Sequence, residues 1–159
     1  MTEYYRIKNI PPETLDEERS LTLSRLSDLV SADCLFEVGS TAVEGVIGKQ
    51  DLDFLVRVKQ DDFLFIRNAL DQAFSRNPEQ ISNDQYQGYT VDSELDVAIQ
   101  LTIEGGPYDD FVAFLSELRE KAELREEYNE LKLKYDGLLM SDYRDAKHEF
   151  IERVLASCS

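Results

Sequence analysis

The run "DLDFLVRV", residues 51–58, constrains this chain more than any other segment, because it places carboxylates on a strand that otherwise belongs to a core. Side chains alternate between the two faces of a strand. The apolar face consists of Leu52, Phe54, Val56 and Val58. Asp51 and Asp53 share the opposite face, where like charges this close repel unless solvent or a cation intervenes. Taken alone, the run favours an ordinary solvated strand face. A cation-binding strand edge becomes the prediction once a second acidic strand is considered.

A second alternating run, "ELDVAIQLTI" at residues 94–103, supplies a third carboxylate. Its apolar positions are Leu95, Val97, Ile99 and Leu101. Asp96 therefore lies on the polar face and can converge on the first two acids if the strands are neighbours. Three carboxylates can hold two cations that activate the attacking group and clamp the departing phosphate. Asp92 and Glu94 have the same parity as Asp96 and remain alternatives for the third ligand.

A Gly-Ser turn lies ten residues before the acidic strand. Gly39 permits a positive φ or a close backbone approach, and Ser40 and Thr41 can cap a short helix. Exposed N–H groups and hydroxyls there would receive phosphate oxygens. Taken alone, the turn favours an ordinary Gly-Ser connection, but the turn, the spacer and Asp-x-Asp together form a more specific pattern. Mg²⁺ suits such a site, because it binds through one or two carboxylates together with substrate phosphates.

The order of predicted elements favours a mixed α+β fold with a small mixed sheet of four to five strands flanked by helices. Periodicity predicts helices over 11–31 and 61–75, and strands over 34–38, 51–58, 85–91 and 94–103. After the breaker at 105–107 the chain reads as a helical C-terminal segment with three apolar stripes. No linker or repeat divides the chain, so residues 1–159 are expected to form a single domain.

The composition excludes several classes of function. A net charge of −16 repels nucleic-acid backbones, so extended nucleic-acid binding is not expected. No run is long enough for a membrane span and no signal-peptide core is present, so a cytoplasmic protein is expected. Two separated cysteines and the single histidine, His148, exclude a structural zinc site.

The motif resembles that of the nucleotidyltransferase superfamily typified by DNA polymerase β. The pattern of an apolar residue, Gly, Ser, a spacer and Asp-apolar-Asp is carried by Val38, Gly39, Ser40, Asp51, Leu52 and Asp53, with Asp96 as the later acid. More closely, the chain resembles the GrpB-like family in "VGSTAVEGVIGKQDLDFLVRV", "DVAIQL" and the tail "LREEYNELKLKYDG…DYRDAKHEFIERVL". It departs from many GrpB-like sequences in having Glu44 in place of proline and in keeping both acids of Asp-x-Asp.

This resemblance implies a nucleotidyltransferase fold and a metal-dependent transfer of a nucleotidyl group. Within the tail, Lys132 follows Tyr128 by four residues and Lys147 follows Tyr143 by four, so each pair lies on neighbouring helical turns. A tyrosine could stack on a base while the lysine contacts phosphate. Packing of the tyrosines at the edge of the core is the alternative. Lys49 and Arg144 are further candidates for phosphate binding.

The sequence thus predicts a transferase that uses Mg²⁺, or Mn²⁺ in its place, with Asp51, Asp53 and Asp96 as catalytic residues. Asp51 and Asp53 would bind the metal, and Asp96 would bind metal or help the acceptor hydroxyl lose its proton. Gly39, Ser40, Thr41, Lys49, Lys132, Lys147, Tyr128 and Tyr143 would bind the nucleotide. The expected substrates are a nucleoside triphosphate, ATP first, and an unidentified small-molecule or protein acceptor. A catalytically silent nucleotide-binding module and an acidic subunit that docks onto a basic protein are the alternatives.

Overall fold

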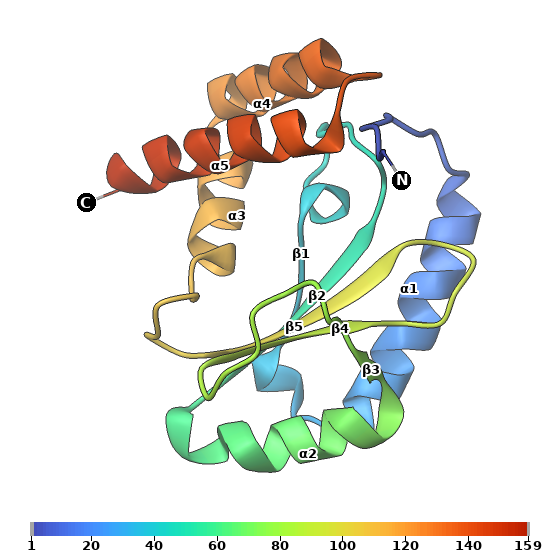
Figure 1. Ribbon diagram of the computed structural model, residues 1–159, viewed down its shortest axis with the longest axis vertical. Helices are drawn as coiled ribbons and strands as arrows, with labels where there is room; N and C mark the ends of the chain where they lie inside the picture. Colours follow the sequence, from blue (N-terminus) through green and yellow to red (C-terminus); the bar gives the residue numbers. More distant parts are fainter. Residues whose placement is uncertain (1, 159) are drawn as a thin grey trace.

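The computed structural model is a five-stranded sheet with helices packed on both faces (Figure 1). It describes residues 2–158. The strands are β1 (Leu35–Val38), β2 (Leu52–Val58), β3 (Ser75–Arg76), β4 (Tyr86–Thr90) and β5 (Val97–Ile103). Their order is β1-β2-β5-β4-β3, and every neighbouring pair is antiparallel except β2 and β5. The expected mixed α+β fold with a small mixed sheet is therefore confirmed.

The helices divide between the two faces of this sheet (Figure 1). Helices α1 (Pro12–Ser27) and α2 (Phe63–Ala73) cover one face. Helices α3 (Phe111–Glu120), α4 (Ala122–Tyr135) and α5 (Met140–Ala156) cover the other and form the expected helical C-terminal segment. Three short 3₁₀ turns connect elements, at η1 (Ala32–Cys34), η2 (Ser40–Ala42) and η3 (Gln60–Asp62).

Local sequence accounts for the main boundaries. Helix α1 begins at Pro12, because the first turn needs no N–H from this residue and the fixed φ of proline suits a helix. The negative charge of Glu13 in the same turn complements the helix dipole. Gly137 has a φ of +88° and ends the α4 region, so the chain can reverse into α5. Strand β2 is rich in apolar residues because helices cover both of its faces.

The predicted core face of β2 is confirmed. Leu52, Phe54 and Val56 are fully buried against α1 and α2. The opposite face is not the solvated one that the alternation allowed, because Leu55 is also fully buried, beneath the C-terminal helices. A carboxylate on this second face therefore lies under protein, where burial disfavours its charge unless a cation is near.

Some boundaries differ from the prediction. The first helix ends at Ser27, and the predicted strand 94–103 begins only at Val97. Residues 92–96 form the turn between β4 and β5, which the backbone bond from the Val91 N–H to the Val97 carbonyl closes. Strand β3 was not predicted, since two residues carry too little alternation to be recognised.

The sheet positions the acidic residues at one of its edges. Strand β1 ends where β2 and β5 begin, with Val38 opposite Asp53 and Asp53 opposite Ala98. The Leu52 N–H donates to the Asp96 carbonyl, so Asp96 lies beside the start of β2. The Gly-Ser turn, both acids of Asp-x-Asp and Asp96 therefore meet at this edge. None of the helices that the structure describes is long and apolar enough to cross a membrane.

Candidate active site

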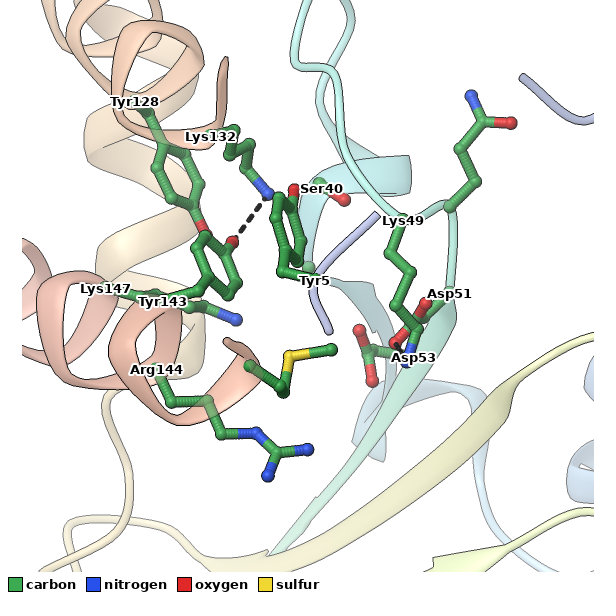
Figure 2. Close-up of a pocket in the computed structure, with 13 residues that line it drawn as sticks. Tyr5, Ser40, Lys49, Asp51, Asp53, Tyr128, Lys132, Tyr143, Arg144 and Lys147 are labelled. Carbon is green, nitrogen blue, oxygen red and sulfur yellow. Dashed lines mark hydrogen bonds and ion pairs between the residues drawn. The ribbon is translucent and has the colours of Figure 1, made fainter. Parts of the chain in front are cut away.

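A cavity of about 130 Å³ lies between the start of β2 and the helices α4 and α5. Asp51 and Asp53 form one wall (Figure 2). Tyr128 and Lys132 from α4, and Tyr143, Arg144 and Lys147 from α5, form the wall that faces it. The cavity thus has an acidic side and a basic, aromatic side.

The Gly-Ser turn packs directly on the acidic wall. Gly39 has a φ of +79°, and a Cβ atom at this position would lie 2.5 Å from Asp53 Oδ2. Only glycine therefore allows the turn to close over the Asp53 carboxylate. Ser40 lines the cavity with its hydroxyl, whereas Thr41 does not. The Thr41 hydroxyl lies 3.1 Å from the Asp51 carbonyl and 3.2 Å from a Glu37 carboxylate oxygen, so Thr41 holds the turn in place.

The basic wall is built around Lys132, which is only 3% exposed. Its Nζ donates to the Tyr143 hydroxyl at 3.1 Å and lies 4.3 Å from the centre of the Tyr128 ring. Among the described residues, no carboxylate forms an ion pair with Lys132 or with Lys147. Arg144 approaches only Glu3, at 3.9 Å on the surface. Two cations without counter-ions face the cavity, which is an arrangement suited to a bound anion.

Tyr5 enters the cavity from the N-terminal segment, between the two walls (Figure 2). Its ring stacks on Tyr143 with centroids 3.7 Å apart, and its hydroxyl is buried without a hydrogen-bond partner. Burial raises the pKa of Tyr5 far above its usual value. Sequence reasoning missed Tyr5, Gln50 and Met140 as cavity residues, because they lie far from the motif or carry no pattern.

Lys49 and Asp96 meet at the edge of the acidic wall. Lys49 Nζ lies 3.5 Å from Asp51 Oδ2 and 3.4 Å from Asp96 Oδ2, so one ammonium group bridges two of the three predicted ligands. Asp96 is mostly exposed and does not line the cavity, and neither do its alternatives Asp92 and Glu94. Within residues 2–158 no group of three acids, cysteines or histidines is placed to share a metal ion.

Burial and neighbouring charges shift the protonation of the site. Desolvation raises the pKa of Asp53 to about 6, although the charges of Lys147, Lys49 and Lys132 oppose the shift. Desolvation also raises the pKa of Asp51. Desolvation and the nearby charge of Lys147 lower the pKa of Lys132 to about 7. An added cation at the acids and an added anion at the lysines would each relieve these penalties.

The carboxylates of Asp51 and Asp53 are suitable ligands for a divalent cation, and that of Asp51 is not fully hydrogen-bonded within the protein. Asp51 Oδ1 is buried without any hydrogen-bond partner, so one strong acceptor faces no donor. Mg²⁺ takes carboxylate oxygens and completes its shell with water or substrate phosphate. The two acids supply such a partial shell, and Lys49 occupies the position of a further cation between Asp51 and Asp96.

Comparison with known proteins gives a family and a fold. The family model described as GrpB protein matches residues 12–157. The UPF0157 protein VC_A0354 of Vibrio cholerae serotype O1 (strain ATCC 39315 / El Tor Inaba N16961) is 32% identical over 122 residues, which are 74% of this chain and 63% of that protein. The chain therefore spans less than two thirds of the length of the curated relative that it matches.

Two solved structures are similar to the chain. The crystal structure of conserved protein GrpB from Enterococcus faecalis matches with a TM-score of 0.67 and 16% identity, over 93% of each chain. A structure reported for the activity of a cytoplasmic RNA terminal U-transferase matches with a TM-score of 0.44 and 15% identity, over 73% of this chain and 37% of that one. The first shares the fold, and the second is too distant to assign a fold or an activity.

Proposed function

This chain belongs to the GrpB family, and from that premise we propose that it is a metal-dependent nucleotidyltransferase acting on a nucleoside triphosphate, ATP first. The observation that carries the proposal is that the acidic wall and the basic wall face each other across one cavity. Two half-buried carboxylates, Asp51 and Asp53, face Lys132 and Lys147, neither of which forms an ion pair within residues 2–158. A triphosphate with its divalent cation complements both walls, because the cation meets the acids while phosphate oxygens meet the lysines.

In the proposed reaction an acceptor hydroxyl oxygen bonds to the α-phosphorus, and the bond to the β-phosphate oxygen breaks. Pyrophosphate leaves with that electron pair, and the acceptor proton passes to a carboxylate oxygen of Asp53. Lys132 and Lys147 hold the charge of the triphosphate, and Ser40 contacts it from the turn. A divalent cation bound at Asp51 and Asp53 would polarise the phosphate oxygens and stabilise developing charge.

The proposal predicts a nucleotide-dependent thermal shift. We expect one or more nucleoside triphosphates at a hundred times the dissociation constant to stabilise the protein by about 2.7 kcal/mol, which corresponds to about 5–10 °C in a domain of this size. The shift should require Mg²⁺ and disappear in the double variant Asp51→Asn/Asp53→Asn. Scanning calorimetry across the common triphosphates, with and without Mg²⁺, measures it and identifies the nucleotide. A flat response to every triphosphate would contradict the proposal.

A silent nucleotide-binding module is the second candidate, and the ion pairs of Lys49 favour it. Lys49 neutralises Asp51 and Asp96 together, which leaves fewer acids for a pair of metal ions. This candidate predicts the same thermal shift but no release of pyrophosphate with any acceptor. A coupled pyrophosphate assay on the nucleotide identified by calorimetry therefore separates the two functions.

Lys49→Gln is expected to tighten Mn²⁺ binding about tenfold in the absence of nucleotide. Without the ammonium, no described cation bridges Asp51 and Asp96, and a divalent cation can take its place and relieve the repulsion between the two carboxylates. Titration followed by Mn²⁺ electron paramagnetic resonance measures the change. Lys8→Gln is the matched control, because Lys8 also approaches Asp96, at 3.9 Å, but does not reach Asp51. Equal Mn²⁺ affinity in wild type and Lys49→Gln would show that Lys49 does not compete for the acids.

A further inference from the structure

A second cavity, of about 500 Å³, lies beside the candidate active site and has the opposite character. It runs between the segment before β4, the loop before α3, the start of α3 and the middle of α5. Its walls are mainly aromatic rings, contributed by Tyr86, Tyr108, Phe111 and Phe114. Only a few polar side chains, including Asp110 and His148, reach it. We refer to this cavity as the aromatic groove.

Helix α5 places the aromatic groove next to the phosphate-binding side of the first cavity. Arg144 and Lys147 line the first cavity, and His148 and Ile151 line the groove. These four residues follow one another at spacings of three, one and three, so they share one stripe of the helix. Both cavities therefore open beneath the same side of α5, one towards its start and the other further along.

Tyr86 connects the groove to the acidic strand across the sheet. The register places Tyr86 opposite Thr102, and Thr102 opposite Arg57, which lies on the same face of β2 as Asp53. The Tyr86 hydroxyl contacts Gln100, which is opposite Leu55, two residues along β2 from Asp53. Burial, with a smaller contribution from the charge of Asp53, raises the pKa of the Tyr86 phenol to about 12. The Tyr86 end of the groove thus lies on the same face of the sheet as Asp53.

We propose that the aromatic groove binds the nucleotidyl acceptor, and that this acceptor is a small molecule with an apolar ring and a hydroxyl group at one end. The proposal rests on the proposed function. A cavity of this size suits a small ligand rather than a polymer. Its apolar walls would leave the hydroxyls of a sugar without partners, which disfavours a carbohydrate acceptor. Asp110 at the groove and the net charge of −16 disfavour an anionic one.

The arrangement gives each part of the acceptor a defined role. The ring lies among the aromatic side chains, and the hydroxyl extends past Tyr86 towards Asp53. There the acceptor oxygen bonds to the α-phosphorus, the bond to the β-phosphate oxygen breaks, and pyrophosphate leaves. The acceptor proton passes to Asp53, so the products are the nucleotidyl ester, pyrophosphate and a proton. Holding both reactants in this geometry is itself a large part of the catalysis.

Binding of 2-naphthylmethanol, an aromatic ring with one primary hydroxyl, tests the groove without any transfer reaction. We expect its ¹H–¹⁵N shift perturbations to fall on residues 80–86, 107–114 and 148–151. Ile81→Glu should weaken this binding at least tenfold, because it places a charge at the rim of the groove. Leu64→Glu should leave it unchanged and is the matched control, since Ile81 is 57% exposed, Leu64 is 55% exposed and Leu64 lies on α2 outside the groove. Perturbations elsewhere, or equal binding by the two variants, would overturn the inference.

The second measurement concerns the orientation of the bound probe, that is, which of its ends lies nearer to the metal site. With Mn²⁺ bound at Asp51 and Asp53, paramagnetic broadening should be strongest for the hydroxymethyl protons of the probe and weaker for the far ring protons. Asp53→Asn should remove the broadening but keep the probe bound. Stronger broadening of the far ring would overturn the assignment of the groove to the acceptor. A Mn²⁺ titration without probe reports separately on the metal site, so failure of the proposed function is distinguishable from failure of the groove.

Discussion

Asp53→Asn is expected to lower metal-dependent nucleotidyl transfer at least 1000-fold, an order of magnitude typical of losing a group that stabilises charge in the transition state. The same change should make the folded protein more stable at pH 8. Asparagine keeps the size of the side chain beneath Gly39 but holds no divalent cation and accepts no proton from the acceptor. Pyrophosphate release measures the first effect and urea denaturation the second.

The gain in stability follows from the raised pKa of Asp53. A carboxyl with a pKa near 6 in the folded state and near 4 in the unfolded chain stabilises the fold only while it is protonated. That contribution is fully present below about pH 4 and is lost as the pH rises through 6. Asp53→Asn should therefore gain about 2 kcal/mol over wild type at pH 8 and almost nothing at pH 4. Stability curves at both pH values test the sign.

The control for this variant is Asp92→Asn, because Asp92 is exposed and does not line the cavity. It should retain transfer and show no stability gain at pH 8. Undiminished transfer by Asp53→Asn would remove Asp53 from the metal site. Equal loss in both variants would instead indicate that Asp92 is a ligand and that the loop between β4 and β5 moves when the metal binds.

Lys132→Met is the second change with a large expected effect. It should weaken binding of the nucleoside triphosphate about 100-fold, because it removes a buried ammonium that forms no ion pair with a described carboxylate and is available to phosphate. A charge-assisted hydrogen bond to phosphate contributes about 1.5–3 kcal/mol, which corresponds to roughly 10- to 100-fold in affinity. Calorimetric titration with the nucleotide measures the loss.

Lys132→Met should also stabilise the unliganded protein at neutral and acidic pH. The pKa of Lys132 is lowered to about 7, so the folded state holds its proton less tightly than the unfolded chain does. This penalty is fully present below pH 7 and disappears as the pH rises past about 10.5. At about 1.4 kcal/mol per pKa unit, the variant should gain about 2–5 kcal/mol at pH 6 and lose that advantage at pH 10.5. A loss of nucleotide affinity together with a gain in stability in Lys132→Met would show that Lys132 serves ligand binding rather than folding.

Lys134→Met provides the matched control on the same helix, since Lys134 is exposed and does not line the cavity. It should change neither nucleotide affinity nor stability by more than about 0.5 kcal/mol, the usual range for surface substitutions. If Lys132→Met and Lys134→Met weakened binding equally, the effect would come from the overall charge of α4. If Lys132→Met bound nucleotide as wild type does, the lysine wall would have no part in the site.

The local pattern predicted the elements that define the acidic wall, and the structure explains why. Alternation places Asp51 and Asp53 together on one face, and the opposite face of β2 is buried as expected. Parity also placed Asp96 on the side of these two acids, and the parallel pairing of β2 and β5 brings it beside Asp51. The parity depends on a period of two residues, which a sequence displays directly. The pairing of β2 with β5, which are not consecutive strands, is visible only in the structure.

The basic wall could be predicted only as candidate residues. Tyr128, Lys132, Tyr143 and Lys147 fall on helical stripes, but stripes do not say which face of the sheet a helix covers. The structure places α4 and α5 over the acids, and it makes Lys132 almost fully buried, which is rare for lysine. Tyr5 could not be predicted at all, because its partner Tyr143 is separated from it by most of the chain. Long-range packing of this kind leaves no periodic signal.

The stack of Tyr5 on Tyr143 has a consequence for the order in which the protein acquires its site during synthesis. Residues from both ends of the chain must meet to close the cavity, and the Tyr5 N–H and carbonyl are also bonded to Leu138 and Gly137. Ribosomes add residues at about 5–20 per second, so the acidic strand emerges seconds before the helix that carries Lys147. A nascent chain would therefore display two carboxylates with nothing to hold a triphosphate against them. Nucleotide binding would begin only after α5 had left the ribosome and packed against the segment around Tyr5.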